Sequence, residues 1–185
     1  MYQPRNHRRP LKRQCTHTTY VLTCEQYDDL LDATGNRCQM CGTPGEDTAR
    51  GVLSIDHEGL LGYWAVRGLL CQPCNVRVEW PDLRGEAGEA YLSRPWYRGV
   101  LDAAGIDGTT IPEPTVIGTY LTAGDVTYHL TERGWQSHWR PKMPPAPVTW
   151  RQLCYQRGPH RIRVHGVMDW DFWPSYGRAR DDSAG

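Results

Sequence analysis

The first segment with a clear hydrophobic period lies between Tyr27 and Thr34, where the larger side chains recur at the spacing of one helix face. Thr23 and Gln26 have the spacing of an N-terminal capping box, and Gly35 is a typical residue just after a helix end. The pattern therefore predicts a helix that begins after Thr23 and ends before Gly35.

Two short apolar segments follow, 52–55 and 63–70, and both are rich in residues that favour strands. The loop between them contains two glycines. We therefore predict an antiparallel hairpin, with Asp56 and His57 at the end of its first strand.

After the hairpin the pattern becomes helical. We predict a short helix over 75–80 and two further helical pieces, 86–92 and 97–104, with a break near Pro95. Residues 105–118 are rich in Gly, Thr and Pro. They are the candidate boundary between two domains.

Beyond that boundary the pattern predicts two helices and a strand. Capping-box spacings predict one helix from Thr122 to Gly134 and another from Thr149 to Arg157. The alternation of residues 161–164 predicts a half-buried strand with cations on one face.

The charge of the chain is balanced but segregated. The 185 residues include 21 Lys and Arg against 21 Asp and Glu, yet residues 1–13 and 133–168 contain basic side chains and no acid. Two basic stretches in a neutral protein indicate either a polyanionic partner such as nucleic acid or two solvated tails. No apolar run is long enough to span a membrane, so we expect no membrane-spanning segment.

The cysteines supply the strongest motif. Two Cys-x-x-Cys pairs have the spacing of a four-cysteine zinc site. Their residues are Cys38 and Cys41 in the first pair and Cys71 and Cys74 in the second. The alternatives are two redox pairs or four buried free thiols. Cys15, Cys24 and Cys154 have no evident mate. Together with a basic N-terminus that no apolar segment follows, they favour a reducing cytoplasm over secretion.

Three residues between and beside the cysteine pairs have the chemistry for phosphodiester cleavage. Asp56 and Asn75 carry oxygen atoms suited to a divalent cation such as Mg²⁺, and the imidazole of His57 can accept a proton from water. On a regular strand, Asp56 and His57 would point to opposite faces, which a strand end can relax. The alternative is a satisfied polar pair in a non-catalytic zinc module.

These motifs resemble the recombination endonuclease VII family of HNH nucleases. The resemblance rests on Ile55-Asp56-His57, on the segment from Val66 to Asn75, and on the lead-in helix and first cysteine pair; it spans about 20–80. It implies a ββα-metal fold with structural zinc, His57 as general base, and Asp56 and Asn75 as ligands of a catalytic divalent cation.

One position departs from the family pattern. Members commonly carry Asp-His-x-His, whereas Gly59 stands here in place of the second histidine. Glu58 could replace it as a ligand, although a loop acid is the favoured interpretation. Arg67 is either a phosphate contact or a surface cation. Tryptophans are expected mainly in packing, with base stacking by Trp135 and Trp139 as the alternative.

The sequence thus predicts an α+β protein: a zinc-braced ββα-metal (HNH) core with an N-terminal helix and a small, basic C-terminal α/β appendage. The expected parts are a flexible basic arm (1–19), the endonuclease domain (20–104), a DNA-contacting module (119–172) and a disordered tail (173–185).

The predicted function is a metal-dependent DNA endonuclease, nicking or junction-resolving, in a bacterial or phage-infected cell. Its partner is DNA, with a homodimer as one expected arrangement and no membrane. The residues expected to contact nucleic acid are Arg67, Arg157, Arg161 and Arg163. The alternatives are a non-catalytic zinc-braced nucleic-acid-binding module and a structural subunit of a larger assembly.

Overall fold

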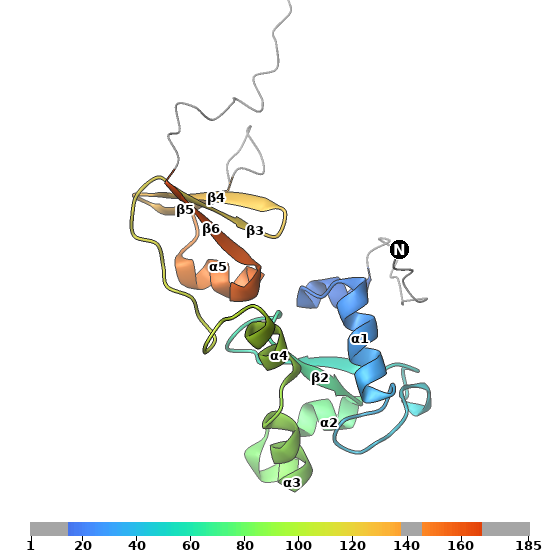
Figure 1. Ribbon diagram of the computed structural model, residues 1–185. Coiled ribbons are helices and arrows are strands. Elements are labelled where there is room, and N and C mark those ends of the chain that lie inside the picture. The colour runs from blue at the N-terminus through green and yellow to red at the C-terminus, as the bar shows by residue number, and fades with distance from the viewer. Residues whose placement is uncertain (1–14, 138–145, 168–185) are drawn as a thin grey trace, which may run out of the picture. The chain divides into compact units, whose positions relative to one another are not determined.

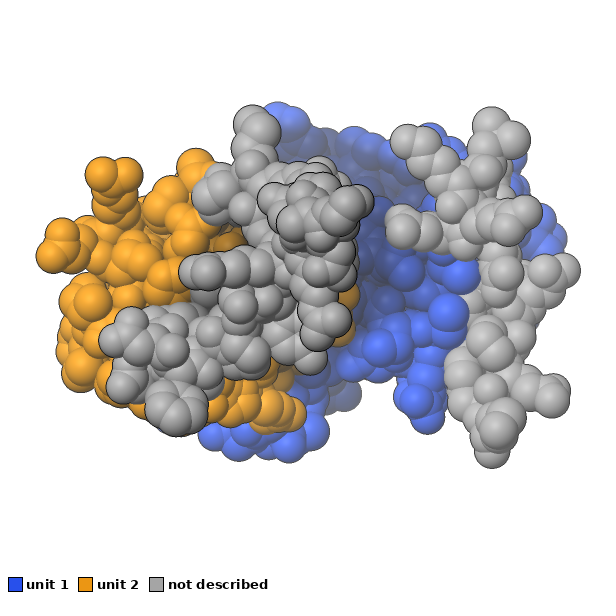
Figure 2. All heavy atoms as spheres, turned by 90° about the horizontal axis from the view of Figure 1, so that it is seen from above, with its two compact units in different colours: residues 1–109 blue, residues 110–185 orange. Residues whose placement is uncertain are grey.

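The computed structural model describes residues 15–137 and 146–167 (Figure 1). The chain divides into two compact units, residues 1–109 (unit 1) and 110–185 (unit 2), coloured blue and orange in Figure 2. Both units contain helices and strands, so the mixed helix-and-sheet class expected from the sequence is confirmed.

Unit 1 contains two 3-10 helices, four α-helices and a two-stranded sheet within its described residues. In chain order these are η1 (Thr16–Tyr20), α1 (Cys24–Thr34), η2 (Gly45–Asp47), β1 (Ser54–His57), β2 (Val66–Leu70), α2 (Gln72–Arg77), α3 (Pro81–Leu92) and α4 (Trp96–Ala103).

The capping box at the start of α1 is confirmed. The backbone N–H of Gln26 donates to Oγ1 of Thr23 at 3.1 Å, and the N–H of Thr23 donates to Oε1 of Gln26 at 3.0 Å. Gly35 ends the helix with a φ of 58°, a left-handed conformation that glycine adopts without strain. Both ends of α1 therefore follow from local sequence.

The predicted antiparallel hairpin is also confirmed. β1 pairs with β2 so that Asp56 lies opposite Gly68 and His57 opposite Val66, with an irregularity in the register between Asp56 and His57. Such a bulge re-aims the side chains that follow it. Asp56 and His57 are thus released from the strict alternation of a regular strand.

The core of unit 1 surrounds β2, whose five residues are all buried. Helices α1 and α4 both contact β2, as Figure 1 shows, and α2 follows it directly. Fully buried Leu69 and Leu70 pack with Leu30 of α1, while Leu101 of α4 belongs to a second cluster with Trp64. The hairpin is consequently a central element that helices hold in place.

Unit 2 is a four-stranded antiparallel sheet with one α-helix among its described residues. The elements are β3 (Thr119–Ala123), β4 (Val126–Thr131), β5 (Gly134–Ser137), α5 (Trp150–Arg157), η3 (Pro159–Arg161) and β6 (Ile162–Val167), and the strand order is β5-β4-β3-β6. Helix α5 lies against the sheet (Figure 1), and its fully buried Leu153 packs in a core with Leu121 and Trp135.

The helix predicted from Thr122 to Gly134 is wrong. This segment forms β3 and β4, joined by a tight turn in which Gly124 has a φ of 67°. Burial alternates with a period of two along both strands, the signature of a sheet with one covered face. The spacing of Thr122 and Asp125 matched a capping box, but the hydrophobic period decides the fold.

Other predictions about the C-terminal half are confirmed. The capping box of Thr149 and Gln152 opens α5, and the segment predicted as a strand, 161–164, lies largely in β6. Trp135 is only 1% exposed, which excludes it as a base-stacking platform. Trp139 and the tail predicted at 173–185 lie outside the described residues.

The N-terminal arm ends earlier than predicted. Thr16–Tyr20 form η1, in which His17 is buried, so the arm cannot extend to residue 19. Residues 1–14 lie outside the described part of the chain. Of the helices in 15–137 and 146–167, none is both long enough and apolar enough to cross a membrane.

We expect Leu153→Ala to destabilise unit 2 while leaving zinc bound in unit 1, because each unit has its own core. Removing a fully buried leucine side chain should lower the free energy of unfolding by about 2–5 kcal/mol. Thermal unfolding followed by calorimetry, with a zinc assay, measures both effects. Exposed Tyr155→Ala on the same helix is the matched control and should change little. Loss of zinc in Leu153→Ala would contradict independent cores.

Candidate active site

The four predicted zinc ligands come together. The sulfur atoms of Cys38, Cys41, Cys71 and Cys74 all lie within 4.8 Å of one another, and the Cys41 and Cys71 sulfurs are 3.6 Å apart. Tetrahedral zinc with bonds of about 2.3 Å places its thiolates about 3.8 Å apart. The cluster could therefore hold zinc.

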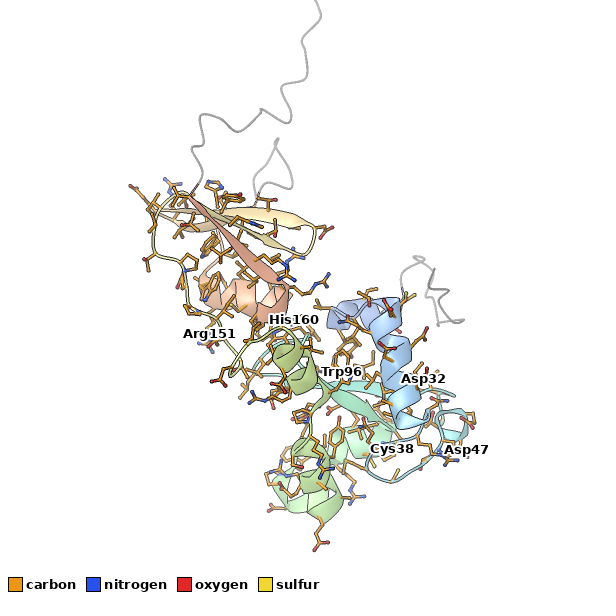
Figure 3. The ribbon with its side chains drawn as sticks, in the orientation of Figure 1. Asp32, Cys38, Asp47, Trp96, Arg151 and His160 are labelled. Carbon is orange, nitrogen blue, oxygen red and sulfur yellow. The ribbon has the colours of Figure 1, made fainter. Side chains whose placement is uncertain are left out.

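Local backbone geometry makes each pair of thiols converge. In the first pair, the N–H of Gly42 donates to the carbonyl of Cys38 at 2.8 Å, and Gly42 takes a left-handed φ of 75°. In the second pair, Cys71 is the N-cap of α2 and Cys74 lies in its first turn. Figure 3 labels Cys38 in the loop that follows α1.

Cys41, the exposed thiol of the cluster, has a lowered pKa. A hydrogen bond with the hydroxyl group of Thr43 at 3.1 Å lowers the pKa of Cys41 to about 6. The thiolate, the form that binds metal, therefore predominates at this position at neutral pH.

A glutamine fastens the first cysteine pair to the hairpin. The N–H of Gln39 donates to the carbonyl of Leu69 at 3.1 Å, and its Oε1 accepts from the N–H of Leu69 at 2.7 Å. A Cβ atom on the neighbouring Gly68 would lie only 2.0 Å from that same Oε1. Glycine is thus required opposite Asp56 for this contact to form.

Asp56 is 3% exposed and its carboxylate is already hydrogen-bonded. Oδ2 accepts from Nε of Arg67 at 2.7 Å and from the hydroxyl of Tyr91 at 2.8 Å, and Oδ1 accepts from Nη2 of Arg67 at 2.8 Å. A carboxylate has about four acceptor positions. Three of them are occupied by protein donors, which leaves about one for a cation.

Arg67 is buried and lies among three carboxylates. Besides Asp56 it pairs with Glu79, and its Nη1 lies 3.6 Å from Oε2 of Glu58. Burial alone would lower the pKa of Arg67, but the hydrogen bonds and charges of Asp56 and Glu79 outweigh burial and raise it. The alternative of a surface cation is wrong, because β2 is buried along its whole length and Arg67 is only 5% exposed. The phosphate contact by Arg67 stays a prediction.

His57 is half-buried between two tyrosine rings. Its ring stacks on Tyr63 with centroids 4.9 Å apart, and Tyr20 meets it edge-on at 5.4 Å. Burial lowers the pKa of His57 and Arg67 lowers it further; the negative charges of Asp56 and its neighbours oppose this without reversing it. The imidazole is therefore neutral at pH 7 and able to accept a proton.

Asn75 offers an oxygen with no protein partner among the described residues. It lies on α2, which packs against β1, and its N–H donates to the carbonyl of Cys71 at 2.9 Å. Its Oδ1 is buried and makes no hydrogen bond there. Buried polar atoms are normally satisfied, so this oxygen is suited to a bound cation or water.

The loop after β1 contains Glu58 and Gly59. Glu58 contributes its backbone to the loop by donating to the carbonyl of Ala65 at 2.9 Å, and its carboxylate faces Arg67. The position is therefore that of a loop acid. A Cβ atom at Gly59 would meet nothing within 4 Å, so space for a larger side chain exists where the histidine is missing.

Four side chains that contact the site residues were not predicted from the sequence: Tyr20, Tyr63, Glu79 and Tyr91. Glu79 follows Asn75 by about one helical turn, a spacing that could have suggested a shared face. The tyrosines carry no local signal, because they reach the site from η1, the hairpin loop and α3.

The three basic residues predicted to contact nucleic acid in the C-terminal half lie in unit 2 and differ in exposure. Arg157 donates from Nε and Nη2 to the hydroxyl of Tyr128 at 3.3 and 3.1 Å, which partly fixes it. Arg161 is half-buried, whereas Arg163 on β6 is exposed. Of the three, Arg163 is the most accessible to a phosphate.

Comparison with known proteins finds a family model that matches the segment containing the site. Residues 13–87 match the model of recombination endonuclease VII. This confirms the resemblance noted from the sequence, and the matched range contains all four cysteines of the cluster together with Asp56, His57 and Asn75. Unit 2 lies outside it.

Two phage proteins are similar over the same part of the chain. The Gene 59 protein of Mycobacterium phage D29 is 38% identical over 60 residues, which is 32% of this chain and 34% of that protein. The Gene 59 protein of Mycobacterium phage L5 is 39% identical over 57 residues, or 31% and 32% of the two chains. The chain thus spans about a third of the length of these relatives. No solved structure matches.

Replacing Arg67 by Met should destabilise unit 1, because Asp56 would lose its bidentate partner while remaining buried. Breaking a buried ion pair costs about 3–5 kcal/mol. Urea unfolding monitored by tryptophan fluorescence measures the loss. The exposed Arg94→Met is the control and should stay within about 0.5 kcal/mol of the unmodified protein. An unchanged urea midpoint for Arg67→Met would show that the ion pair of Arg67 with Asp56 does not stabilise unit 1.

Proposed function

We propose that the chain is a metal-dependent DNA endonuclease of the HNH type, with β1, β2 and α2 as its ββα-metal core. The family match over residues 13–87 supports a nuclease that acts on DNA in recombination. The observation that carries the catalytic assignment is the neutral His57 at the end of β1. Helix α2 contacts this strand and carries Asn75, whose buried Oδ1 has no hydrogen-bond partner among the described residues.

His57 is proposed to be the general base. Its neutral imidazole would accept a proton from the attacking water, and the rings of Tyr20 and Tyr63 limit its orientation and exclude bulk solvent from part of its surface. The bulge before His57 separates it from Asp56, so that the two side chains can serve different roles.

Asp56 and Asn75 are the proposed ligands of a divalent cation such as Mg²⁺. Their donor set fits a hard cation: Asn75 has a buried oxygen without a partner, and Asp56 retains about one acceptor position. When bound, the cation would neutralise charge on the scissile phosphate and on the departing oxygen. Arg67 and Tyr91 orient the Asp56 carboxylate, which is a positioning role.

The remaining roles follow from this assignment. Zinc in the four-cysteine cluster would be a structural brace, and exposed Arg163 in unit 2 would contact the DNA backbone, with Arg157 and Arg161 contributing charge. Cutting two strands of a branched substrate would favour a homodimer.

One observation favours a second candidate, a zinc-braced module that binds nucleic acid without cutting it. Both carboxylate oxygens of Asp56 accept hydrogen bonds from protein donors, which is how a purely structural acid behaves. In that case the unmodified protein would retain DNA and leave it intact at every Mg²⁺ concentration.

His57→Ala should lower the cleavage rate by about two to four orders of magnitude, the usual contribution of a positioned general base. Single-turnover nicking of supercoiled plasmid, with the enzyme in excess, measures this rate without interference from changes in affinity. His165→Ala in unit 2, where His165 also stacks on a tyrosine, is the matched control and should cut normally. Undiminished nicking by a nuclease-free His57→Ala preparation would remove His57 from the mechanism.

The pH dependence of cleavage should reveal the depressed pKa of His57. Because the base must be neutral, the rate should rise with pH through a midpoint below 6.5 and be level by about pH 7. Tyr63→Ala exposes the ring and should move that midpoint upward. Tyr120→Ala, which removes a tyrosine stacked on a histidine in unit 2, should not move it. A midpoint at or above 6.5 in the unmodified protein would contradict the burial argument.

A further inference from the structure

A second group of metal-binding side chains lies outside the four-cysteine cluster. The ligand atoms of Cys15, His17 and Cys24 all lie within 4.8 Å of one another, and the two sulfur atoms are 4.0 Å apart. Tetrahedral zinc separates two thiolates by about 3.8 Å. The two thiols that appeared unmatched in the sequence are therefore neighbours in space, and a buried imidazole lies beside them.

We propose that Cys15, His17 and Cys24 bind a second zinc ion. Two thiolates and one imidazole are ligands that zinc favours. With these three ligands from the described part of the chain, a fourth coordination position remains for water or another donor. Cys24 is only half-buried, so solvent can reach this position. This proposal does not depend on the nuclease assignment, because it rests on the ligand atoms alone.

The burial of the group distinguishes it from a chance surface cluster. Cys15 is 7% exposed and His17 only 1%, so these two side chains are not part of the surface. The His17 ring stacks on Tyr27 of α1, with centroids 4.8 Å apart, which fixes its orientation. Two of the three ligands are thus held before any metal arrives.

The three residues bracket a strained turn. Cys15 is the N-cap of η1, His17 lies inside it, and Cys24 is the first residue of α1. Between them Val21 takes a φ of 60°, an uncommon and costly conformation for a β-branched residue. A shared metal would tie both sides of this turn together and oppose its relaxation.

The turn leads to the candidate active site. Tyr20, the last residue of η1, meets His57 edge-on at 5.4 Å and Tyr63 at 5.8 Å. A metal that fixes η1 would therefore fix one wall of the His57 environment. The second zinc would have a positioning role at the active site without contacting the substrate.

A disulfide between Cys15 and Cys24 is the competing use of these thiols. A disulfide requires about 2.05 Å between its sulfur atoms and makes no use of the imidazole. The 4.0 Å separation and the presence of His17 favour the metal. The two uses differ in metal content and in mass.

The direct test is the zinc content of the full chain, purified under reducing conditions and measured by plasma mass spectrometry. We expect two zinc ions per chain in the unmodified protein and one in Cys24→Ser. Cys154→Ser should keep two, because Cys154 is a half-buried thiol of unit 2 whose pKa burial and the charge of Glu113 raise to about 11. One zinc per chain in the unmodified protein, with no change in Cys24→Ser, would overturn the proposal.

Cobalt substitution separates the two sites even where a variant is unstable. In the unmodified protein, Co²⁺ should give thiolate charge-transfer bands from both sites. Cys24→Ser, which removes one of the two thiolates of the proposed second site, should lose part of this intensity, whereas Cys41→Ser should reduce the bands of the four-cysteine site. A Cys24→Ser spectrum identical to that of the unmodified protein would also overturn the second site. So would a mass two units lower in the purified protein that signals a disulfide between Cys15 and Cys24. None of these readouts involves DNA cleavage, so they are independent of the nuclease proposal.

Discussion

The constraint on which unit 1 depends is the convergence of two distant Cys-x-x-Cys turns on one point. A tetrahedral metal requires its four thiolates about 3.8 Å apart, and the four sulfurs already lie within 4.8 Å of one another. The segment between Cys41 and Cys71, which contains the hairpin β1–β2, is a loop whose two ends meet at the cysteine cluster. Gln39 then hydrogen-bonds the first turn to Leu69 of β2. The cysteine cluster therefore helps to fix the position of the hairpin and of His57 within it.

Within unit 1, burial keeps the imidazole of His57 neutral, and three hydrogen bonds fix the carboxylate of Asp56. Arg67 donates two hydrogen bonds to Asp56 and Tyr91 adds a third. Burial is the largest influence on the pKa of His57 and lowers it, whereas the negative charge of Asp56 opposes this shift. A buried ion pair contributes little to net stability because desolvation offsets the attraction. Its presence here is better explained by orientation of Asp56 than by a need for stability.

The sequence predicts the structure well where the signal is local, and poorly where contacts between distant residues determine the structure. The cysteine pairs, the capping boxes of Thr23 and Thr149, and the β1–β2 hairpin follow from residues close together in the chain. The contact of Asp56 with Tyr91 joins residues far apart, and no spacing rule predicts it. The helix expected after Thr122 failed because a capping-box spacing was preferred to the period of two that governs β3 and β4. The group of Cys15, His17 and Cys24 was missed because its spacing matches no common metal motif.

The central claim is that this site cuts DNA with the help of a divalent cation. The most direct measurement incubates the full, unmodified chain with supercoiled plasmid, a four-way junction, and linear, mismatched and single-stranded DNA, each with Mg²⁺ and with EDTA at a concentration that spares the zinc. We expect cleavage of at least one substrate with Mg²⁺ and none with EDTA. Binding to these substrates without cleavage of any of them at any Mg²⁺ concentration would contradict this claim.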